Sequence, residues 1–384
     1  MRGKNRLRKQ KIDLAVYDEH FEPHFVKDIL LNDKDAINEV ALGFTGPVSA
    51  IIINVNDHGY CKVRYDQKSL DSFVHSLQRI TDPVTRAQVW RQLWLLVMDR
   101  KMSSLQFLDF VIKQIPYETV DQIIQVALMN LSGLVSYYIP IDHVTEKKRA
   151  MFDTLLHLLA NENIEPTTKI PIVDNLFGFL SDIDHLKLAQ QWLDTGVIFR
   201  DPATKRELFT LGQRHKYSIL KRLFEEPSIS TELKNQLLER TLGDDKSDIA
   251  QNTRDTCFAL LPTAESKAQI WQQITDVNST ESIYKRAAKM GGFYSYKQIE
   301  LTRPYFDQFY EVLPLIYEKQ AFKYVESFFH SLLPRMEIKD EHIVKLLALK
   351  LQTPDNNTNF ANLMNEGIEL VIRSKNVREF AAKQ

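Results

Sequence analysis

Apolar residues follow two different spacings along the chain, and the change occurs near Asp66. Before Asp66, short runs rich in β-branched residues alternate with turn residues, which is typical of strands. After Asp66, apolar residues recur at intervals of three and four as far as the C-terminus, which predicts helices. We therefore expect a mostly α protein of the α+β class, with a partial β-sandwich domain at residues 1–66 and a helical domain at residues 67–384.

The segment before Asp66 contains about five predicted strands, fewer than the roughly seven of a closed β-sandwich. They are Ile12–Val16, Phe25–Leu31, Ile37–Leu42, Val48–Val55 and Tyr60–Tyr65, the last two forming a hairpin. The run Ile51-Ile52-Ile53 is apolar at consecutive positions, which indicates cover on both faces. A small sheet with open edges is the expected result, and open strand edges recruit other chains.

Helices are predicted to follow one another after Asp66 without strands between them. Ser69 is the expected N-cap of the first helix, and Asp82-Pro83 is a strong start signal for the second. Later helices are predicted at 105–114, 119–132, 144–162, 167–180, 183–195, 204–214, 218–224, 230–242, 248–261, 264–275, 279–290, 296–333 as a pair, 339–350 and 359–382. Irregular helix pairs in simple succession predict an α-solenoid of the HEAT-like kind.

The second predicted helix carries a wide apolar stripe that includes Trp90 and Trp94. Aromatic residues at helical spacing are more often core than ligand platform, so both tryptophans are expected to be buried. Trp90 is expected to pack at the junction with the strands, against Tyr60 or Tyr65.

Composition narrows the class of protein further. The 384 residues are 44% hydrophobic and 26% charged, which is enough to bury a core, and the net charge of -1 gives no bias toward nucleic acid. No apolar run is long enough for a membrane span, and no secretory signal is readable. Two distant cysteines, Cys61 and Cys257, indicate a reducing compartment, so we expect a cytoplasmic protein. The basic residues before Ile12 are expected to form a solvated terminus rather than a targeting segment or a nucleic-acid arm.

No catalytic or metal-binding pattern is recognisable in the sequence. None of the ten histidines lies in H-E-x-x-H, and no phosphate loop, nucleophile elbow or paired-cysteine motif is present. His20, Glu22 and His24 alternate, but Pro23 interrupts them, so a polar hairpin tip is expected rather than a metal site. Two further histidines, at positions 157 and 330, lie among apolar residues and are expected to be core or groove-lining residues.

The segment Gly59-Tyr60-Cys61-Lys62-Val63-Arg64-Tyr65-Asp66 resembles the Gly-Tyr-Tyr-Arg-Val-Asn-Tyr-Asp signature of the aminopeptidase N family of zinc aminopeptidases. In that family the signature joins a β-sandwich to a helical domain. Similar segments are Lys11–Asp18, Ser49–Asp57, Thr81–Asp99, Met290-Gly291-Gly292-Phe293, Pro304-Tyr305-Phe306, Leu313-Pro314 and Leu333-Pro334. The resemblance implies that this chain is the C-terminal part of such an enzyme.

The resemblance also implies which parts of the enzyme this chain lacks. The family holds zinc with two histidines of H-E-x-x-H and a further glutamate, and it binds the peptide N-terminus with a Gly-x-Met-Glu-Asn segment. Neither motif is present, so the chain is expected to hold no cofactor and to be inactive alone, with zinc in a catalytic domain outside it. The helical domain of such a metallopeptidase caps the catalytic cleft and shapes peptide access.

Four residues are candidates for peptide contact on the strength of the resemblance. Phe293, Tyr294 and Tyr296 offer aromatic faces, and Arg303 offers a positive charge to a C-terminal carboxylate. The competing interpretation is an ordinary interhelical loop. The expected partners are peptide substrates of the full-length enzyme, together with a separate catalytic chain or a second copy paired through the sheet edges, but no nucleic acid. The alternative function is a non-catalytic α-solenoid interaction module derived from the same family.

Overall fold

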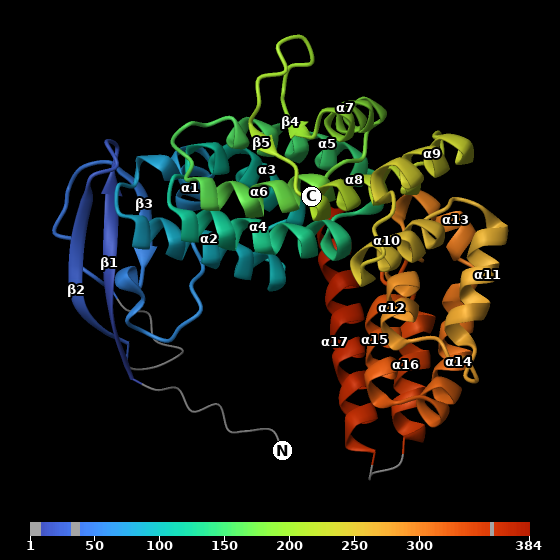
Figure 1. Cartoon of the computed structure of the whole chain (residues 1–384). Coiled ribbons are helices and arrows are strands. Elements are labelled where there is room, and N and C mark those ends of the chain that lie inside the picture. The colour runs from blue at the N-terminus through green and yellow to red at the C-terminus, as the bar shows by residue number, and fades with distance from the viewer. Residues whose placement is uncertain (1–8, 32–38, 354–356) are drawn as a thin grey trace. The chain divides into compact units, whose positions relative to one another are not determined.

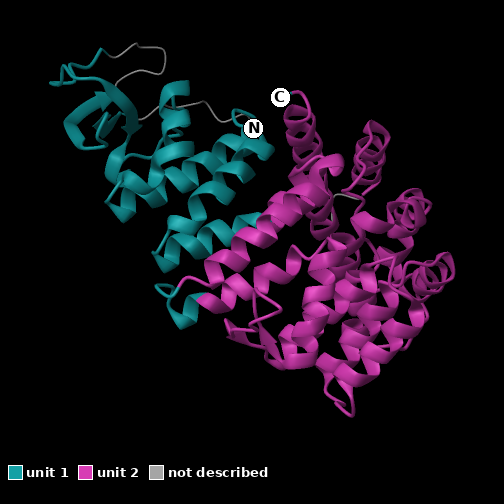
Figure 2. Ribbon diagram, turned by 90° about the horizontal axis from the view of Figure 1, so that it is seen from above, with its two compact units in different colours: residues 1–131, 162–168, 384 teal, residues 132–161, 169–383 magenta. Residues whose placement is uncertain are grey.

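The computed structural model of the chain describes residues 9–31, 39–353 and 357–384. Most of these residues lie in helices, and a three-stranded sheet lies near the N-terminus, so the predicted fold class is confirmed (Figure 1). The chain forms two compact units (Figure 2). Unit 1 comprises residues 1–131, 162–168 and 384, and unit 2 comprises residues 132–161 and 169–383. The predicted boundary at Asp66 and the solenoid arrangement remain predictions.

The sheet of unit 1 has the strand order β2-β1-β3, with both pairs antiparallel. The central strand β1 (Gln10–Asp18) is buried at four successive positions from Leu14 to Tyr17, so it is covered on both faces. The strand β2 (Pro23–Leu31) forms a largely exposed edge, and β3 (Val48–Ile53) forms the other edge. Of the three isoleucines in β3 only Ile52 is buried, so the predicted two-sided cover belongs to β1 instead.

Two of the predicted strands are not found. Residues 39–42, the described part of the predicted strand Ile37–Leu42, are not in a strand, and residues 37 and 38 lie outside the described residues. Tyr60–Tyr65 is not a strand either. The reason is the left-handed Asn54, whose side chain accepts from Gly59 N and donates to Gly59 O, both at 2.7 Å. This bond pair closes a loop where the predicted hairpin would need an extended ladder.

The loop passes so close to β1 at position 59 that only a glycine fits there. A Cβ atom at this position would lie 2.8 Å from the Ile12 side chain and 3.0 Å from Asn54 Oδ1. These distances are shorter than van der Waals contact, so any larger residue would push the loop away from β1.

The first two helices begin at aspartate caps. The helix α1 (Gln67–Ser76) follows Asp66, whose carboxylate accepts from Ser69 N at 3.0 Å. Asp66 is therefore the N-cap, and the prediction of Ser69 was wrong. The Ser69 hydroxyl instead accepts from Ile51 N at 2.9 Å, which ties α1 to β3. The helix α2 (Pro83–Met98) begins as predicted, because Asp82 accepts from the N–H of its third residue at 2.8 Å and Pro83 occupies the first helical position.

Trp90 of α2 is buried as predicted, but its neighbour is different. Its ring lies 4.4 Å from the ring of Phe110 in α3 (Ser104–Gln114). Tyr60 is 97% exposed, and Tyr65 packs against Phe73 of α1 instead. Trp94 is only half-buried, at the edge of the same aromatic group.

Two of the boundaries between the units lie within helices, and unit 2 is otherwise built almost entirely from helices. The crossing helices are α4 (Asp121–Gly133) and α6 (Pro166–Gly178). A π-helical turn, Leu134–Tyr138, follows α4. The others are α5 (Ile141–Leu159), α7 (Ile183–Thr195), α8 (Gln213–Glu225), α9 (Thr231–Leu242), α10 (Asp248–Ala259), α11 (Ala264–Thr275), α12 (Ile283–Gly291), α13 (Ile299–Thr302), α14 (Tyr305–Lys319), α15 (Phe322–Leu332), α16 (Asp340–Gln352) and α17 (Thr358–Ala381).

A short hairpin replaces the predicted helix at 204–214. The strands β4 (Val197–Ile198) and β5 (Phe209–Thr210) pair antiparallel between α7 and α8, so the prediction of helices without intervening strands was wrong as well. Gly196, with a φ of 77°, ends α7 in the left-handed conformation and turns the chain out of the helix. The indole of Trp192 donates to the carbonyl of Phe199 at 2.9 Å, which ties the first strand of the hairpin to α7.

The aromatic core of unit 2 lies among α11, α12, α14, α15 and α17. Phe309, Phe328 and Phe329 are fully buried in it. Gly367 permits α17 to cross this core closely, because a Cβ atom there would come within van der Waals distance of the Phe329 ring. In Figure 1, α15, α16 and α17 run side by side, consistent with the packing of α16 against α17.

Buried cations close the C-terminal ends of three helices in unit 2. Lys234 Nζ donates to Glu226 O just after α8 at 2.6 Å, and Lys267 Nζ donates to Ala259 O at the end of α10 at 2.6 Å. Arg286 donates to Ile274 O at the end of α11 at 3.1 Å. Helix C-terminal carbonyls lack partners within the helix, and the helix dipole favours positive charge there, so each cation meets an unsatisfied end.

Candidate functional site

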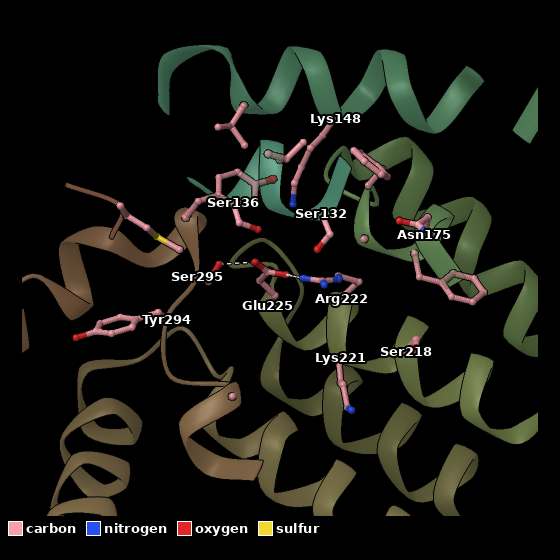
Figure 3. Close-up of a pocket in the computed structure, with 18 of the residues that line it drawn as sticks. Ser132, Ser136, Lys148, Asn175, Ser218, Lys221, Arg222, Glu225, Tyr294 and Ser295 are labelled. Carbon is pink, nitrogen blue, oxygen red and sulfur yellow. Dashed lines mark hydrogen bonds and ion pairs between the residues drawn. The ribbon is translucent and has the colours of Figure 1, made fainter. Parts of the chain in front are cut away.

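A cavity of about 540 Å³ lies within unit 2 (Figure 3). Its walls come from the end of α4, the π-helical turn, α5, α6, α8, and the end of α12 with the segment that follows it. Met336 and, from α17, Arg378 complete the lining. Volumes of this order are typical of sites for small molecules or side chains. Tyr294 and Tyr296, two of the predicted contact residues, belong to its lining.

Glu225, at the end of α8, is the acidic centre of the pocket. Its buried carboxylate accepts from Arg222 Nη1 at 2.7 Å and from the Ser295 hydroxyl. Burial opposes ionisation, but the charges of Arg222 and Lys148 outweigh it and lower the pKa of Glu225 to about 2. Glu225 is therefore an ionised structural partner at neutral pH and has no proton to donate.

Lys148 of α5 is a buried cation that faces the pocket. It is only 7% exposed, and Figure 3 shows its amine pointing from α5 into the pocket. It makes no hydrogen bond or ion pair with any residue that the structure describes, and its Nζ lies 4.4 Å from the centroid of the Tyr296 ring. Burial, with the neighbouring Arg222, lowers the pKa of Lys148 to about 7. The amine is thus partly uncharged near neutral pH.

The segment after α12 is tied firmly to the surrounding helices. Lys297 Nζ donates to Ser181 O at 2.7 Å and pairs with Glu226. Gln298 Nε2 donates to Glu225 O at 2.9 Å and to Leu260 O at 2.7 Å. These bonds hold the two tyrosines of the lining in a fixed backbone frame, so the pocket wall is preorganised.

The four predicted contact residues lie in different surroundings. Tyr294 and Tyr296 line the pocket, whereas Phe293 is fully buried in the aromatic core, 5.5 Å from Trp271 between ring centroids. Arg303 lies outside the described lining. Its guanidinium donates to both carboxylate oxygens of Glu337, at 2.8 and 2.7 Å, and also pairs with Glu300. Peptide contact by these four residues remains a prediction.

Lys148, Arg222, Glu225 and Ser295 were not singled out from the sequence. A signal did exist for Lys148, because it shares a helical face with the apolar Val144, and both are buried. A lysine among apolar positions at helical spacing is usually interpreted as a solvated residue whose stem covers the edge of the core. The Ser295 contact joins residues 70 positions apart, and helical periodicity contains no information about such a pair.

The histidines do not form a metal site in the described part of the chain. His20 lies in the polar turn between β1 and β2, as predicted, and His24 lies at the start of β2 with its Nε2 3.2 Å from Asp18 Oδ2. His157 and His330 are both exposed, so neither is a core residue, and a groove-lining role remains a prediction. Among residues 9–31, 39–353 and 357–384, no three histidine, cysteine or carboxylate side chains are grouped to hold a metal, so these residues do not fit the family's zinc.

Within the same ranges, no helix is both long enough and apolar enough to cross a bilayer.

Comparison with known proteins identifies the family of the chain. The model of the ERAP1-like C-terminal domain matches residues 50–373. The chain is also 21% identical over 394 residues to the aminopeptidase N of Streptomyces lividans, a comparison that covers 100% of this chain and 44% of that protein. The chain thus spans less than half the length of this relative. The aminopeptidase resemblance of Gly59–Asp66 and its neighbours is confirmed, and the chain belongs to the family of ERAP1-like C-terminal domains.

Proposed function

We propose that this chain acts as the C-terminal region of a zinc metalloaminopeptidase, where it borders the peptide-binding space and shapes peptide access. The zinc and the residues that activate water would lie in the catalytic part of the enzyme, outside this chain. The family and the name of the Streptomyces lividans relative support this assignment. The observation that carries it is the preorganised pocket of unit 2, which contains an aromatic wall and an unpaired buried cation.

The lining offers groups that suit an extended peptide. Ser132, Ser136 and Asn175 provide neutral hydrogen-bonding side chains, and Tyr296 provides a ring face. Lys148 provides a positive charge that no described carboxylate pairs with, so a carboxylate of a peptide could pair with it. Arg303 is a less available partner for a carboxylate, because Glu337 already binds its guanidinium through two nitrogens.

Peptide binding to the purified chain tests the role of the pocket. Tyr296→Ala removes the aromatic face, so it should weaken the binding of longer peptides by about tenfold and that of dipeptides less, as measured by calorimetry. Tyr284→Ala is the matched control, because Tyr284 is 78% exposed and lies outside the lining. Arg303→Ala tests the fourth candidate in the same way. Equal effects on long and short peptides, or no effect of Tyr296→Ala, would contradict the assignment.

A chimera tests the relation to the catalytic region. In it, this chain replaces the matched 44% of the Streptomyces lividans aminopeptidase N. A region that shapes access should give an enzyme whose KM depends on peptide length and changes with Tyr296→Ala. An interaction module of the alternative kind would bind its partner in isolation and leave the KM of the chimera insensitive to Tyr296→Ala.

A further inference from the structure

Two lysines of unit 2 have the same lowered pKa of about 7 but differ in what their amines contact. Lys267 Nζ is enclosed in the core and donates to Ala259 O at 2.6 Å and to Phe293 O at 2.9 Å. Lys148 Nζ has no such acceptor among the described residues and faces the cavity (Figure 3). Hydrogen bonding and enclosure block the amine of Lys267 from reagents, whereas the amine of Lys148 is open to a molecule in the pocket.

We propose that Lys148 is a modification site at which a small carbonyl compound bearing a carboxylate forms a reversible imine. An adduct there would occupy the amine that a peptide carboxylate is proposed to meet, so the two ligands would compete. The reaction itself requires neither a peptide nor zinc, and it goes beyond the function proposed above. Desolvation of a lysine beside another cation is a recognised way to keep an amine nucleophilic at neutral pH. Arg222 supplies the neighbouring charge here, and the wall of the Tyr296 ring limits solvation on one side.

The chemistry requires no further reactant. The lone pair of the uncharged Nζ attacks the carbonyl carbon, so that a C–N bond forms as the carbonyl π bond breaks. The oxygen takes up the two hydrogens of the amine through solvent and leaves as water, which gives the C=N bond. Nothing is oxidised or reduced, and hydrolysis reverses the reaction. Glu225 stays ionised beside the reacting amine and stabilises the protonated imine by its charge.

The charge of the lining indicates the carboxylate on the ligand. The described lining contains Lys148, Lys221, Arg222 and Arg378 but only two carboxylates, those of Asp174 and Glu225. Asp174 lies 3.5 Å from His215, and Glu225 is hydrogen-bonded to Arg222, so the two carboxylates do not balance all four cations. A carbonyl compound with its own carboxylate restores the balance, and a cavity of about 540 Å³ admits it easily.

Reductive trapping tests the site on the whole chain. Glyoxylate and sodium cyanoborohydride would convert an imine at Lys148 into a carboxymethyl adduct, which peptide mapping by mass spectrometry locates. We expect Lys148 to be labelled at least about tenfold faster at pH 7 than the exposed Lys187. The labelling rate should rise between about pH 6 and pH 8, because Lys148 loses its proton in that range.

Three controls separate the geometry from the acidity of the amine. Lys267 should remain unlabelled although its pKa is the same, because its amine is enclosed. Lys148→Arg should abolish the adduct with an unchanged melting temperature, and Lys187→Arg should leave labelling at Lys148 unchanged. Acetaldehyde, which lacks the carboxylate, should require about tenfold higher concentration than glyoxylate. Labelling of Lys148 no faster than that of Lys187 would overturn the site, and equal labelling by the two aldehydes would overturn the carboxylate requirement.

Discussion

Lys148 places an amine in the pocket, and its burial there lowers the stability of the fold. Its pKa falls from the ordinary 10.5 to about 7 on folding, so the folded state binds this proton less tightly than the unfolded state does. The resulting penalty is complete below about pH 7 and disappears as the pH rises toward 10.5. Residues that reduce stability in this way are frequently functional ones.

Lys148→Met should therefore raise the free energy of unfolding at pH 7, by about 1–3 kcal/mol, because it removes the desolvated charge and keeps the length of the side chain. Arg222 continues to hold Glu225, so the carboxylate is not left unpaired. Urea unfolding at pH 7 and at pH 9.5 measures the gain, which should shrink at the higher pH. Lys267→Met is the matched control and should instead destabilise by about 1–3 kcal/mol, since it leaves Ala259 O and Phe293 O without their donor. A loss of stability in Lys148→Met as large as in Lys267→Met would refute this explanation.

Trp90, in contrast to Lys148, stabilises the fold, and it does so by packing alone. Trp90→Ala should lower the free energy of unfolding by about 3–5 kcal/mol, because the indole fills the space beside Phe110. Denaturant unfolding measures the change, with Tyr60→Ala as a control that should be nearly neutral because Tyr60 is 97% exposed. A loss below about 1 kcal/mol for Trp90→Ala would show that α2 does not depend on this contact.

At the scale of elements, the structure separates what periodicity can predict from what it cannot. Asp82-Pro83 marked the start of α2 correctly, because a cap and a helix-compatible proline act within one turn. The loop at Asn54 and the hairpin that contains β4 and β5 could not be predicted, because each depends on a side chain that bonds the backbone outside its own element. Leu208 and Leu211 are spaced like residues of a helix, yet their N–H groups donate to Ile198 O and Gly196 O.

Cations that donate to carbonyls at helix ends also stabilise unit 2, and Arg286 is one of them. It is 2% exposed, donates to Ile274 O and Asp276 O, and stacks on the Tyr324 ring at 3.9 Å. Arg286→Met should lower the free energy of unfolding by about 1–3 kcal/mol, because Asp276 O loses its donor and Ile274 O keeps only the Tyr324 hydroxyl. Arg286→Lys, measured in the same denaturant series, should recover only part of the loss, since an ammonium lacks the planar fork of the guanidinium. Full stability of Arg286→Met would show that water replaces the side chain at these carbonyls.

At the scale of the whole molecule, the sequence motif near Gly59 indicated the family, and the apolar spacing indicated the class. The pocket could not be predicted, because its walls combine segments from α4 to α17. The net charge of its lining also depends on ion pairs that the sequence does not reveal. The same limit applies to Arg303, whose two carboxylate partners include Glu337, 34 positions away.

The purified chain should contain no stoichiometric zinc and should not hydrolyse an aminoacyl chromogenic substrate, because its described residues offer no group of three ligands. Elemental analysis and a hydrolysis assay check both points. One tightly bound zinc per chain, retained after dialysis against a weak chelator, would contradict the expectation. The control is the intact Streptomyces lividans aminopeptidase N, carried through the same purification and assay.

The hairpin between α7 and α8 has a practical consequence for protein engineering. Its two ends are held together, because Leu211 N donates to Gly196 O at 2.8 Å, and residues 201–207 between its strands are exposed. The chain therefore leaves and re-enters unit 2 at one point. A reporter domain whose own termini lie close together could be grafted into this tip without displacing α7 or α8. With a fluorescent reporter, the graft would label the helical unit without changing any residue of the pocket lining.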